Sequence, residues 1–334
     1  MTTEKPTLPR TAVLEMTYRC NHACLFCSCP WYGDQFPVEK EMEADEWMEV
    51  LDDLIGRGIR DVAFTGGEAL LKEGLFDIMR HAVALGFSTH LLSNGRAMSD
   101  DVIAFCAEHK VQLSLSLPGF ETFQEHTASN TDPSDILQWI RKSRDAGVAT
   151  VAGITVTNRN LHELFETMAE ALLAGAHSIL LNRFMPGGRG LKHRDMELTT
   201  EQLVEMLDTA EEVLRTANRR GHVGTELPLC VIEPSKYESL KVGTRCSAAV
   251  GFFAIDPSGY VRVCNHSQNR LFPWRELGTA TEHPYWKRFT DKAFLPANCL
   301  ACEHSSQCDG GCREAAHIVG GELSSPDPLL SIRG

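Results

Sequence analysis

Residues 11–27 of this chain read TAVLEMTYRCNHACLFC. Residues 12–16 form a short apolar run of the kind that makes a buried parallel strand. Three cysteines follow at once, Cys20, Cys24 and Cys27, in a C-x3-C-x2-C pattern. Because three thiolates can hold three irons of a [4Fe–4S] cluster and leave the fourth iron open, the segment predicts a cluster-binding loop at the carboxyl end of a strand.

The spacing of these cysteines leaves two other metal sites open. One is a zinc site in which Cys29 or His22 supplies the fourth ligand. The other is a fully ligated electron-transfer cluster that uses Cys29. The rest of the sequence has to decide between them.

The composition narrows the classes of protein to which the chain can belong. Its 334 residues are 43% apolar and 23% charged, which is usual for a folded globular protein. The formal charge of −13 argues against nucleic acid as a partner, because phosphate binding needs a basic surface. No apolar run is long enough to span a membrane, and the N-terminal residues lack the apolar core of a secretion signal. Twelve cysteines in such a chain predict metal or redox chemistry in the cytoplasm rather than disulfides.

Short apolar runs alternate with segments of helical period between residues 11 and 183, which predicts parallel strands joined by helices. This alternation indicates an α/β fold, a partial (β/α)6 barrel, whose active site forms at the carboxyl ends of the strands. The expected strands are residues 12–16, 59–64, 87–92, 111–117, 148–156 and 177–181, and the expected helices are residues 44–55, 70–85, 99–109, 134–146, 161–174 and 200–219.

The pattern changes after Gly221. Residues 252–255 and 260–263 flank an Asp-Pro-Ser-Gly turn and predict a β-hairpin, and the remainder is rich in loops and cysteines. A region with so few long apolar elements needs metal to hold it together. We therefore expect two domains, a barrel over residues 1–221 and a small loop-rich iron–sulfur domain over residues 222–334.

The C-x3-C-x2-C loop resembles that of the radical S-adenosylmethionine (SAM) enzymes, which usually have an aromatic residue where this chain has Phe26. In that family the open iron of the [4Fe–4S] cluster chelates SAM. The resemblance extends to the ends of the later strands, where the family places further SAM contacts. It implies cofactor-binding roles for Gly66, Gly67, Glu68, Ser93, Asn94, Ser114, Ser116, Asn158 and Asn182, of which residues 66–68 match a GGE motif that meets the SAM ammonium.

The C-terminal cysteines resemble the SPASM extension, or its shorter twitch relative, that follows radical SAM barrels in peptide-modifying enzymes. The resemblance implies one or two auxiliary [4Fe–4S] clusters. By the pattern of that family, Cys246, Cys264 and Cys312 would hold one cluster, and Cys299, Cys302 and Cys308 the other.

The chain departs from the SPASM pattern because no cysteine follows Cys312. A cysteine shortly before Cys246 is also expected, and the nearest one, Cys230, lies 16 residues upstream. Two clusters would therefore need an open iron or a non-cysteine ligand, for which we consider Asp309, His304 and His317. A single cluster with spare thiols, or zinc held by residues 299–312, also fits the spacing.

Besides Cys29, two cysteines stand outside these groups. Cys106, in the expected helix 99–109, is interpreted as a packing residue. Cys230, at the junction of the two domains, has three roles open to it: cluster ligand, donor of a hydrogen atom to a substrate radical, or packing residue.

The resemblance implies reductive cleavage of SAM to a 5′-deoxyadenosyl radical, which abstracts a hydrogen atom from the substrate. The leading expectation is maturation of a peptide or protein side chain by cross-linking, oxidation or epimerisation. The alternative is a small-molecule dehydrogenase or epimerase acting on a sugar, aminoglycoside or nucleoside. Expected partners are an electron donor such as flavodoxin or ferredoxin and, because the first strand starts near residue 11, a separate leader-recognition protein.

Overall fold

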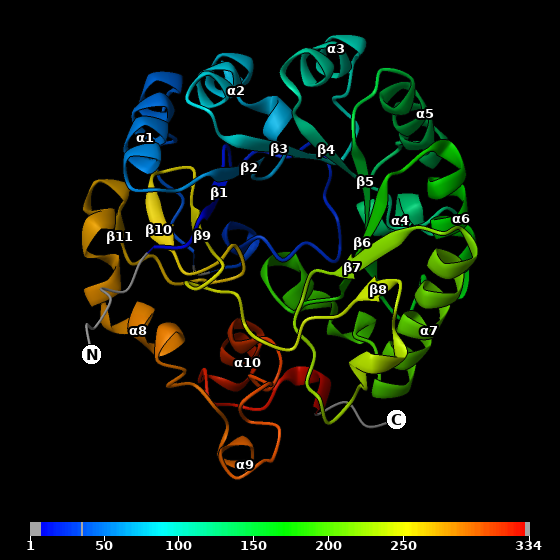
Figure 1. Cartoon of the computed structure of the whole chain (residues 1–334), viewed down its shortest axis with the longest axis vertical. Coiled ribbons are helices and arrows are strands. Elements are labelled where there is room, and N and C mark those ends of the chain that lie inside the picture. Colours follow the sequence, from blue (N-terminus) through cyan, green and yellow to red (C-terminus); the bar gives the residue numbers. More distant parts are fainter. Residues whose placement is uncertain (1–7, 35, 331–334) are drawn as a thin grey trace.

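A computed structural model describes residues 8–34 and 36–330. Its strands form one sheet in the order β11-β10-β9-β1-β2-β3-β4-β5-β6-β7-β8, and β1 to β8 run parallel to their neighbours. The sheet curves around a central space (Figure 1). The strands are β1 (Thr11–Glu15), β2 (Asp61–Thr65), β3 (Ser88–Ser93), β4 (Gln112–Ser116), β5 (Thr150–Val156), β6 (Ser178–Arg183), β7 (Arg220–Val223), β8 (Leu240–Lys241), β9 (Phe252–Ile255), β10 (Tyr260–Arg262) and β11 (Phe272–Pro273).

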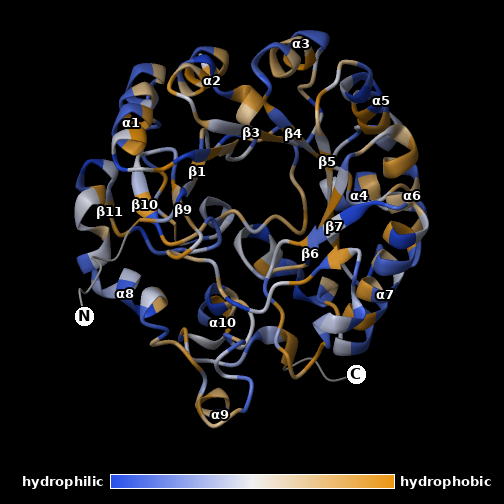
Figure 2. Cartoon of the chain, in the orientation of Figure 1, coloured by the Kyte–Doolittle hydropathy of each residue, from blue (hydrophilic) through white to orange (hydrophobic). Residues whose placement is uncertain are grey.

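Six long helices cover the outside of the curved sheet (Figure 1). They are α1 (Ala44–Gly56), α2 (Leu75–Ala84), α3 (Asp100–His109), α5 (Pro133–Asp145), α6 (Leu164–Ala174) and α7 (Thr200–Thr216). Side-chain caps fix where several of them begin: Ser99 accepts from Val102 N, and Asp132 accepts from Ser134 N just before Pro133. Figure 2 shows apolar residues on the helix sides that face the sheet. The α/β fold with a partial parallel barrel is confirmed.

Shorter helices complete the chain. The α-helices are α4 (Phe123–Thr127), α8 (Pro284–Thr290), α9 (Ala297–Leu300) and α10 (Arg313–Gly320). The 3-10 helices are Pro30–Tyr32, Ala69–Leu71, Leu161–Glu163, Gly188–Met196, Pro234–Lys236, Trp274–Glu282 and Pro328–Leu330. Helices α8, α9 and α10 lie on the side where the sheet does not close (Figure 1). In the part of the chain that the structure describes, no helix has the length and apolar character needed to cross a membrane.

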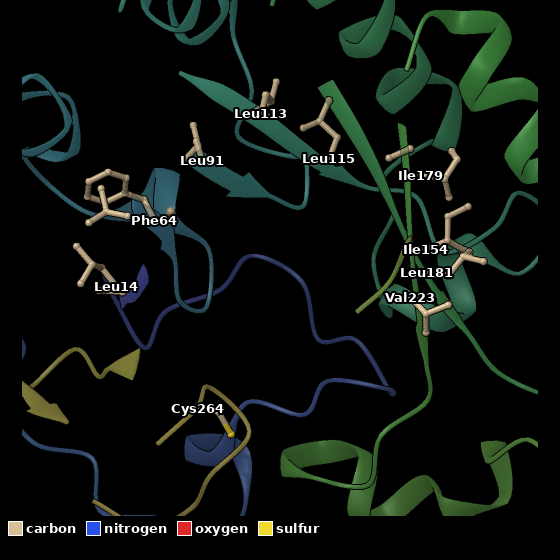
Figure 3. Close-up of a cluster of buried hydrophobic side chains, with 14 of the residues drawn as sticks. Leu14, Phe64, Leu91, Leu113, Leu115, Ile154, Ile179, Leu181, Val223 and Cys264 are labelled. Atoms are coloured by element: carbon tan, nitrogen blue, oxygen red, sulfur yellow. The ribbon is translucent and has the colours of Figure 1, made fainter. Parts of the chain in front are cut away.

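Alternation along the strands divides their side chains between two faces. Leu14, Phe64, Leu91 and Leu113 occupy one register across β1 to β4, and all four are fully buried. Figure 3 shows them with side chains from β5 and β6 in one buried cluster. The residues of opposite parity point into the barrel, so their last members at the strand ends are available for a site.

The C-terminal hairpin is confirmed as β9 and β10, but it does not stand apart from the barrel. Strand β9 pairs in parallel with β1, with Thr11 opposite Phe252, and a buried ion pair joins Arg262 to Glu15. The predicted domain boundary at residues 221 and 222 lies inside β7, and the division into two domains stays a prediction. The sequence did not predict strands β7, β8 and β11, because pairing between distant segments has no local signal in a sequence.

Most predicted bounds lie within three residues of the observed ones, and two helices that begin later than expected are informative. The helix expected over residues 70–85 begins at Leu75, because the chain first makes the 3-10 turn Ala69–Leu71 and then passes through Gly74 with a φ of 75°. The helix expected over residues 161–174 likewise begins at Leu164 after a 3-10 turn. In both places the chain turns at the carboxyl end of a strand, where the cavity lies.

Candidate active site

The loop that carries Cys20, Cys24 and Cys27 leaves the carboxyl end of β1 and lines a cavity of about 370 Å³. Backbone hydrogen bonds fix the loop on α4: Ala23 N donates to Thr127 O at 3.1 Å, and Leu25 N donates to His126 O at 2.8 Å. Burial raises the pKa of the Cys20 and Cys24 thiols, and the neighbouring cysteines add to the effect on Cys24. The three thiols therefore lie close together in a poorly solvated place, where a positive group would stabilise their thiolate forms.

Gly66 and Gly67 let β2 approach the cysteine loop. Gly67 N donates to Thr17 O at 2.8 Å, and Glu68 N donates to Arg19 O at 2.8 Å. A Cβ on Gly67 would lie 2.2 Å from Arg19 O, and one on Gly66, whose φ is 133°, would lie 2.7 Å from Thr17 O. The two glycines are therefore required by the contact between β2 and the loop.

Glu68 connects the ends of β2 and β3 to the cysteine loop. Its buried carboxylate accepts from Ser93 Oγ at 2.9 Å and from Asn94 N at 2.8 Å. The Asn94 amide in turn donates to Cys20 Sγ at 3.6 Å and to Asn21 Oδ1 at 2.8 Å. This network orients the carboxylate toward the cavity beside the three thiols.

The inward-facing residues at the later strand ends form the far wall of the cavity. They are Ser116 of β4, Thr155 of β5 and Asn182 of β6, and Phe26 lines the cavity from the cysteine loop. Thr155 was missed because its place at a strand end becomes clear only once the register is known.

Two predicted cofactor contacts lie elsewhere. Ser114 faces inward one pleat below Ser116, where its hydroxyl is 2.9 Å from His90 Nε2, and it does not reach the described cavity lining. Asn158 lies beyond the end of β5, is exposed, and donates to Asp195 O at 2.6 Å. The structure therefore gives the cofactor-binding prediction no support at these two positions, because Ser114 lies one pleat below the cavity lining and the turn after β5 carries Asn158 away from it.

Cys29 lies beside Cys27 and also lines the cavity. A hydrogen bond from the Cys29 thiol lowers the pKa of Cys27 to about 7. Gly188 holds this region in place, since a Cβ there would lie 2.3 Å from Cys29 O. The contact between the Cys29 and Cys27 thiols could not be predicted from the sequence, and the role of Cys29 as a fourth ligand stays a hypothesis.

A second group of cysteines faces the first across the same cavity. Cys246, Cys264 and Cys312 all line it, and their thiols lie within electrostatic range of one another. Burial raises the pKa of Cys312 to about 12, with Glu226 as the next cause. The described residues thus place two sets of three cysteines around one space.

Comparison with known proteins identifies the domain that carries the cysteine loop. Residues 14–171 match the family model described as the radical SAM superfamily. The chain carries a radical SAM domain. The cysteine loop, Glu68 and the strand-end residues all lie in or next to the matched segment, so the radical SAM domain accounts for that side of the cavity.

Relatives extend the likeness beyond the radical SAM domain. A PqqA peptide cyclase of Rhodopseudomonas palustris is 24% identical over 97% of this chain and 87% of that protein. The structure of Streptococcus suis SuiB bound to precursor peptide SuiA has a TM-score of 0.76 at 15% identity, covering 96% of this chain and 75% of that one. Native anSMEcpe with bound AdoMet has a TM-score of 0.74 at 16% identity, covering 97% and 94%. The radical SAM domain takes SAM and a SAM-binding [4Fe–4S] cluster as its cofactors. The likeness of the whole chain to these proteins agrees with the expectation of auxiliary [4Fe–4S] clusters.

The donor set around the cavity fits these cofactors. Besides Cys29, six cysteines line it in two sets of three, and sulfur is the soft donor that iron–sulfur clusters take. Two buried polar atoms in its wall, Glu314 Oε2 and His266 Nε2, have no hydrogen-bond partner among the described residues. No set of three or more His, Cys, Asp or Glu side chains in residues 8–34 and 36–330 is placed to hold a single metal ion.

Cys299, Cys302 and Cys308 form a separate group outside the described cavity lining. Helix α9 and the turns after it bring them together: Cys302 N donates to Cys299 O at 3.2 Å, and Ser305 N donates to Cys302 O at 3.0 Å. Cys230 is exposed and is likewise absent from that lining. The hypothesis that Cys230 donates a hydrogen atom to a substrate radical therefore has no geometric support, because a donor must reach the cavity.

Cys106 is buried on α3, and burial alone raises its pKa to about 12. No other cysteine acts on its thiol, which agrees with its interpretation as a packing residue.

Glu226, Glu314 and His266 are cavity residues that sequence reasoning missed. Glu314 and His266 each lie two residues after a predicted cluster cysteine, and this proximity in the sequence was the available signal for their place in the cavity.

Proposed function

We propose that this radical SAM enzyme modifies a side chain of a peptide or protein. When bound, the cluster and SAM supply a 5′-deoxyadenosyl radical that abstracts a hydrogen atom from the substrate. The observation that carries the proposal is the shared cavity, which places Cys20, Cys24 and Cys27 on one side and Cys246, Cys264 and Cys312 on the other. A substrate between them meets both clusters at once.

The chain's own residues have distinct tasks in this proposal. Cys20, Cys24 and Cys27 hold the SAM-binding cluster. Glu68, oriented by Ser93 and the Asn94 backbone, accepts hydrogen bonds from the SAM ammonium, because a buried anion is the natural partner of a cation. Ser116, Thr155 and Asn182 offer polar contacts to the rest of SAM. The apolar side chains of Phe26, Leu92 and Met185 exclude water from the same space.

The peptide as substrate is supported by the relatives. The PqqA peptide cyclase matches nearly the whole chain. SuiB, which has the same fold, has been solved with its precursor peptide SuiA bound. Cys246, Cys264 and Cys312 would hold a cluster that can take up one electron. After hydrogen abstraction the substrate radical would lose that electron and a proton, so that the substrate loses two hydrogen atoms in all. This arrangement favours an oxidative outcome, such as a cross-link, over epimerisation.

We further propose that flavodoxin or ferredoxin supplies the electron that starts the reaction, since the SAM-binding cluster must be reduced first. A separate protein would recognise the leader segment of the precursor peptide. The enzyme would work in the cytoplasm, where thiols stay reduced.

The experiment uses anaerobically reconstituted enzyme with SAM, dithionite and the peptide encoded by a short open reading frame next to its gene. We expect deuterium from a labelled peptide in 5′-deoxyadenosine and a product lighter by two hydrogen atoms. The Cys24→Ala enzyme should give neither, whereas the Cys106→Ala enzyme should retain both. Deuterium transfer from a sugar, aminoglycoside or nucleoside, and none from the peptide, would overturn the proposal in favour of a small-molecule enzyme.

A further inference from the structure

The group of Cys299, Cys302 and Cys308 lacks a fourth thiol in its own segment. A [4Fe–4S] cluster has four irons to ligate, and no cysteine follows Cys312. Cys312 itself belongs to the cavity with Cys246 and Cys264. A ligand for the fourth iron must therefore come from another part of the chain or from outside the protein.

Residues 227–231 pack against this group. Leu229 N donates to Cys308 Sγ at 3.4 Å, so the backbone next to Cys230 touches a cluster cysteine directly. Val231 N donates to Pro228 O at 3.0 Å, which makes a turn with Cys230 near its tip. Leu227 N donates to Gly243 O at 2.9 Å and fixes the start of the segment.

Contacts with Gly310 bring two thiols of the group near each other. Gly310 N donates to Cys308 Sγ at 3.3 Å, and a Cβ on Gly310 would lie 3.4 Å from Cys299 Sγ. The thiols that act electrostatically on Cys230 are those of Cys308, Cys299 and Cys302. Cys308 thus accepts two backbone N–H groups, as cluster sulfurs commonly do.

The other side chains considered for this position are committed elsewhere. Asp309 accepts from Cys246 N at 2.9 Å with one oxygen and from Lys292 Nζ at 2.6 Å with the other. His317 Nδ1 lies 3.1 Å from the hydroxyl of Tyr285 on α8. His304 is exposed and lies 3.7 Å from Glu303. Neither histidine contacts the three thiols, so Cys230 is the best-placed donor among the described residues.

We propose that Cys230 is the fourth ligand of a second auxiliary [4Fe–4S] cluster, completing the set of Cys299, Cys302 and Cys308. The missing downstream cysteine is replaced by one that lies 69 residues before Cys299 in the sequence. A cluster with four thiolates has no open iron for substrate. It lies outside the cavity lining and next to an exposed residue, which suits electron exchange with a carrier protein.

The test is alkylation of the reconstituted holoenzyme with iodoacetamide, followed by peptide mass spectrometry, before and after iron removal by a chelator. Because Cys230 is exposed, a free thiol there reacts in both states. We expect protection in the holoenzyme and rapid alkylation after iron removal. Equal alkylation of Cys230 in the two states overturns the proposal.

Substitution provides the second measurement. Cys230→Ala should lose about four of about twelve irons per chain, or keep them with changed g values of one reduced auxiliary cluster. Cys230→Ser, which offers an oxygen ligand, should keep the iron with shifted g values, and the Cys106→Ala control should match the wild type. A Cys230→Ala enzyme with unchanged iron content and unchanged g values also overturns the proposal. Neither readout uses peptide product, so the proposed function can fail while this assignment stands.

Discussion

The guanidinium of Arg183, at the end of β6, lies 2.5 Å from the carboxylate of Asp327, far along the chain. Both side chains are buried, and the same Asp327 oxygen accepts from Cys312 N at 2.7 Å. The pair therefore connects β6 of the barrel to Cys312, a cysteine of the first auxiliary group. It also covers the side of the cavity that the sheet leaves open.

Asp327→Ala should destabilise the enzyme by about 3–5 kcal/mol, because it leaves the buried Arg183 charge unpaired. It should also lower the occupancy of the cluster held with Cys312. Thermal unfolding and iron content measure the two effects. Glu322→Ala, at an exposed position nearby in the sequence, should change the free energy of unfolding by less than about 0.5 kcal/mol. A wild-type unfolding temperature in Asp327→Ala would contradict the role of this pair.

Glu68→Gln should weaken SAM binding by about 10- to 100-fold, because a hydrogen bond to a charged group contributes about 1.5–3 kcal/mol. The backbone contact of residue 68 with Arg19 O does not depend on the side chain, so the iron content should stay unchanged. Equilibrium binding of SAM measures the affinity. The control is Glu73→Gln, an exposed carboxylate five residues away, which should bind SAM as the wild type does.

Gly67→Ala should displace the cysteine loop, since the new Cβ would lie 2.2 Å from Arg19 O. We expect a loss of about 1–3 kcal/mol in stability and of about four irons per chain. Iron and sulfide assays after reconstitution check this. Gly56→Ala at the end of α1 meets no atom within 4 Å and should be neutral or slightly stabilising. Full iron content in Gly67→Ala would show that the loop tolerates a methyl group there.

The carboxylate of Glu163 accepts a set of hydrogen bonds whose contribution to the stability of the fold depends on pH. Burial by itself raises the pKa of Glu163, but hydrogen bonds from the Thr122 hydroxyl and from the backbone N–H groups of Phe120, Glu121 and Thr122 outweigh it and hold the pKa below its usual range. Since the folded-state pKa is depressed, the contribution to stability is present above the unfolded pKa and is lost as pH falls below it.

Glu163→Gln should therefore be less stable than the wild type by about 1–3 kcal/mol at about pH 7, and the difference should shrink toward about pH 4. Thermal unfolding of both proteins across this range measures it. Glu166→Gln, on the exposed side of α6, should follow the wild type at every pH. A difference between Glu163→Gln and the wild type that grows on acidification would contradict the depressed pKa.

Much of the fold could be predicted from the sequence because its signals are local. The strand and helix periods of residues 11–183 and the hairpin turn at residues 256–259 each lie within one short window. The C-x3-C-x2-C spacing likewise identified the SAM-binding loop, since its three cysteines lie close together in the sequence, in a single loop. The positions of Ser114 and Asn158 relative to the cavity could not be settled in this way, because they depend on how deep in the barrel Ser114 lies and on how the chain turns after β5.

The sequence by itself determined the α/β barrel, the radical SAM loop and the presence of further cluster cysteines. Only the tertiary structure decided how those cysteines divide. It brings Cys246, Cys264 and Cys312 to the cavity of the SAM-binding loop, and it packs the segment of Cys230 against Cys308. The physical reason is that these contacts join segments far apart in the chain. They exist only because β9 pairs with β1 and the Arg183–Asp327 pair holds the C-terminal segment against the barrel.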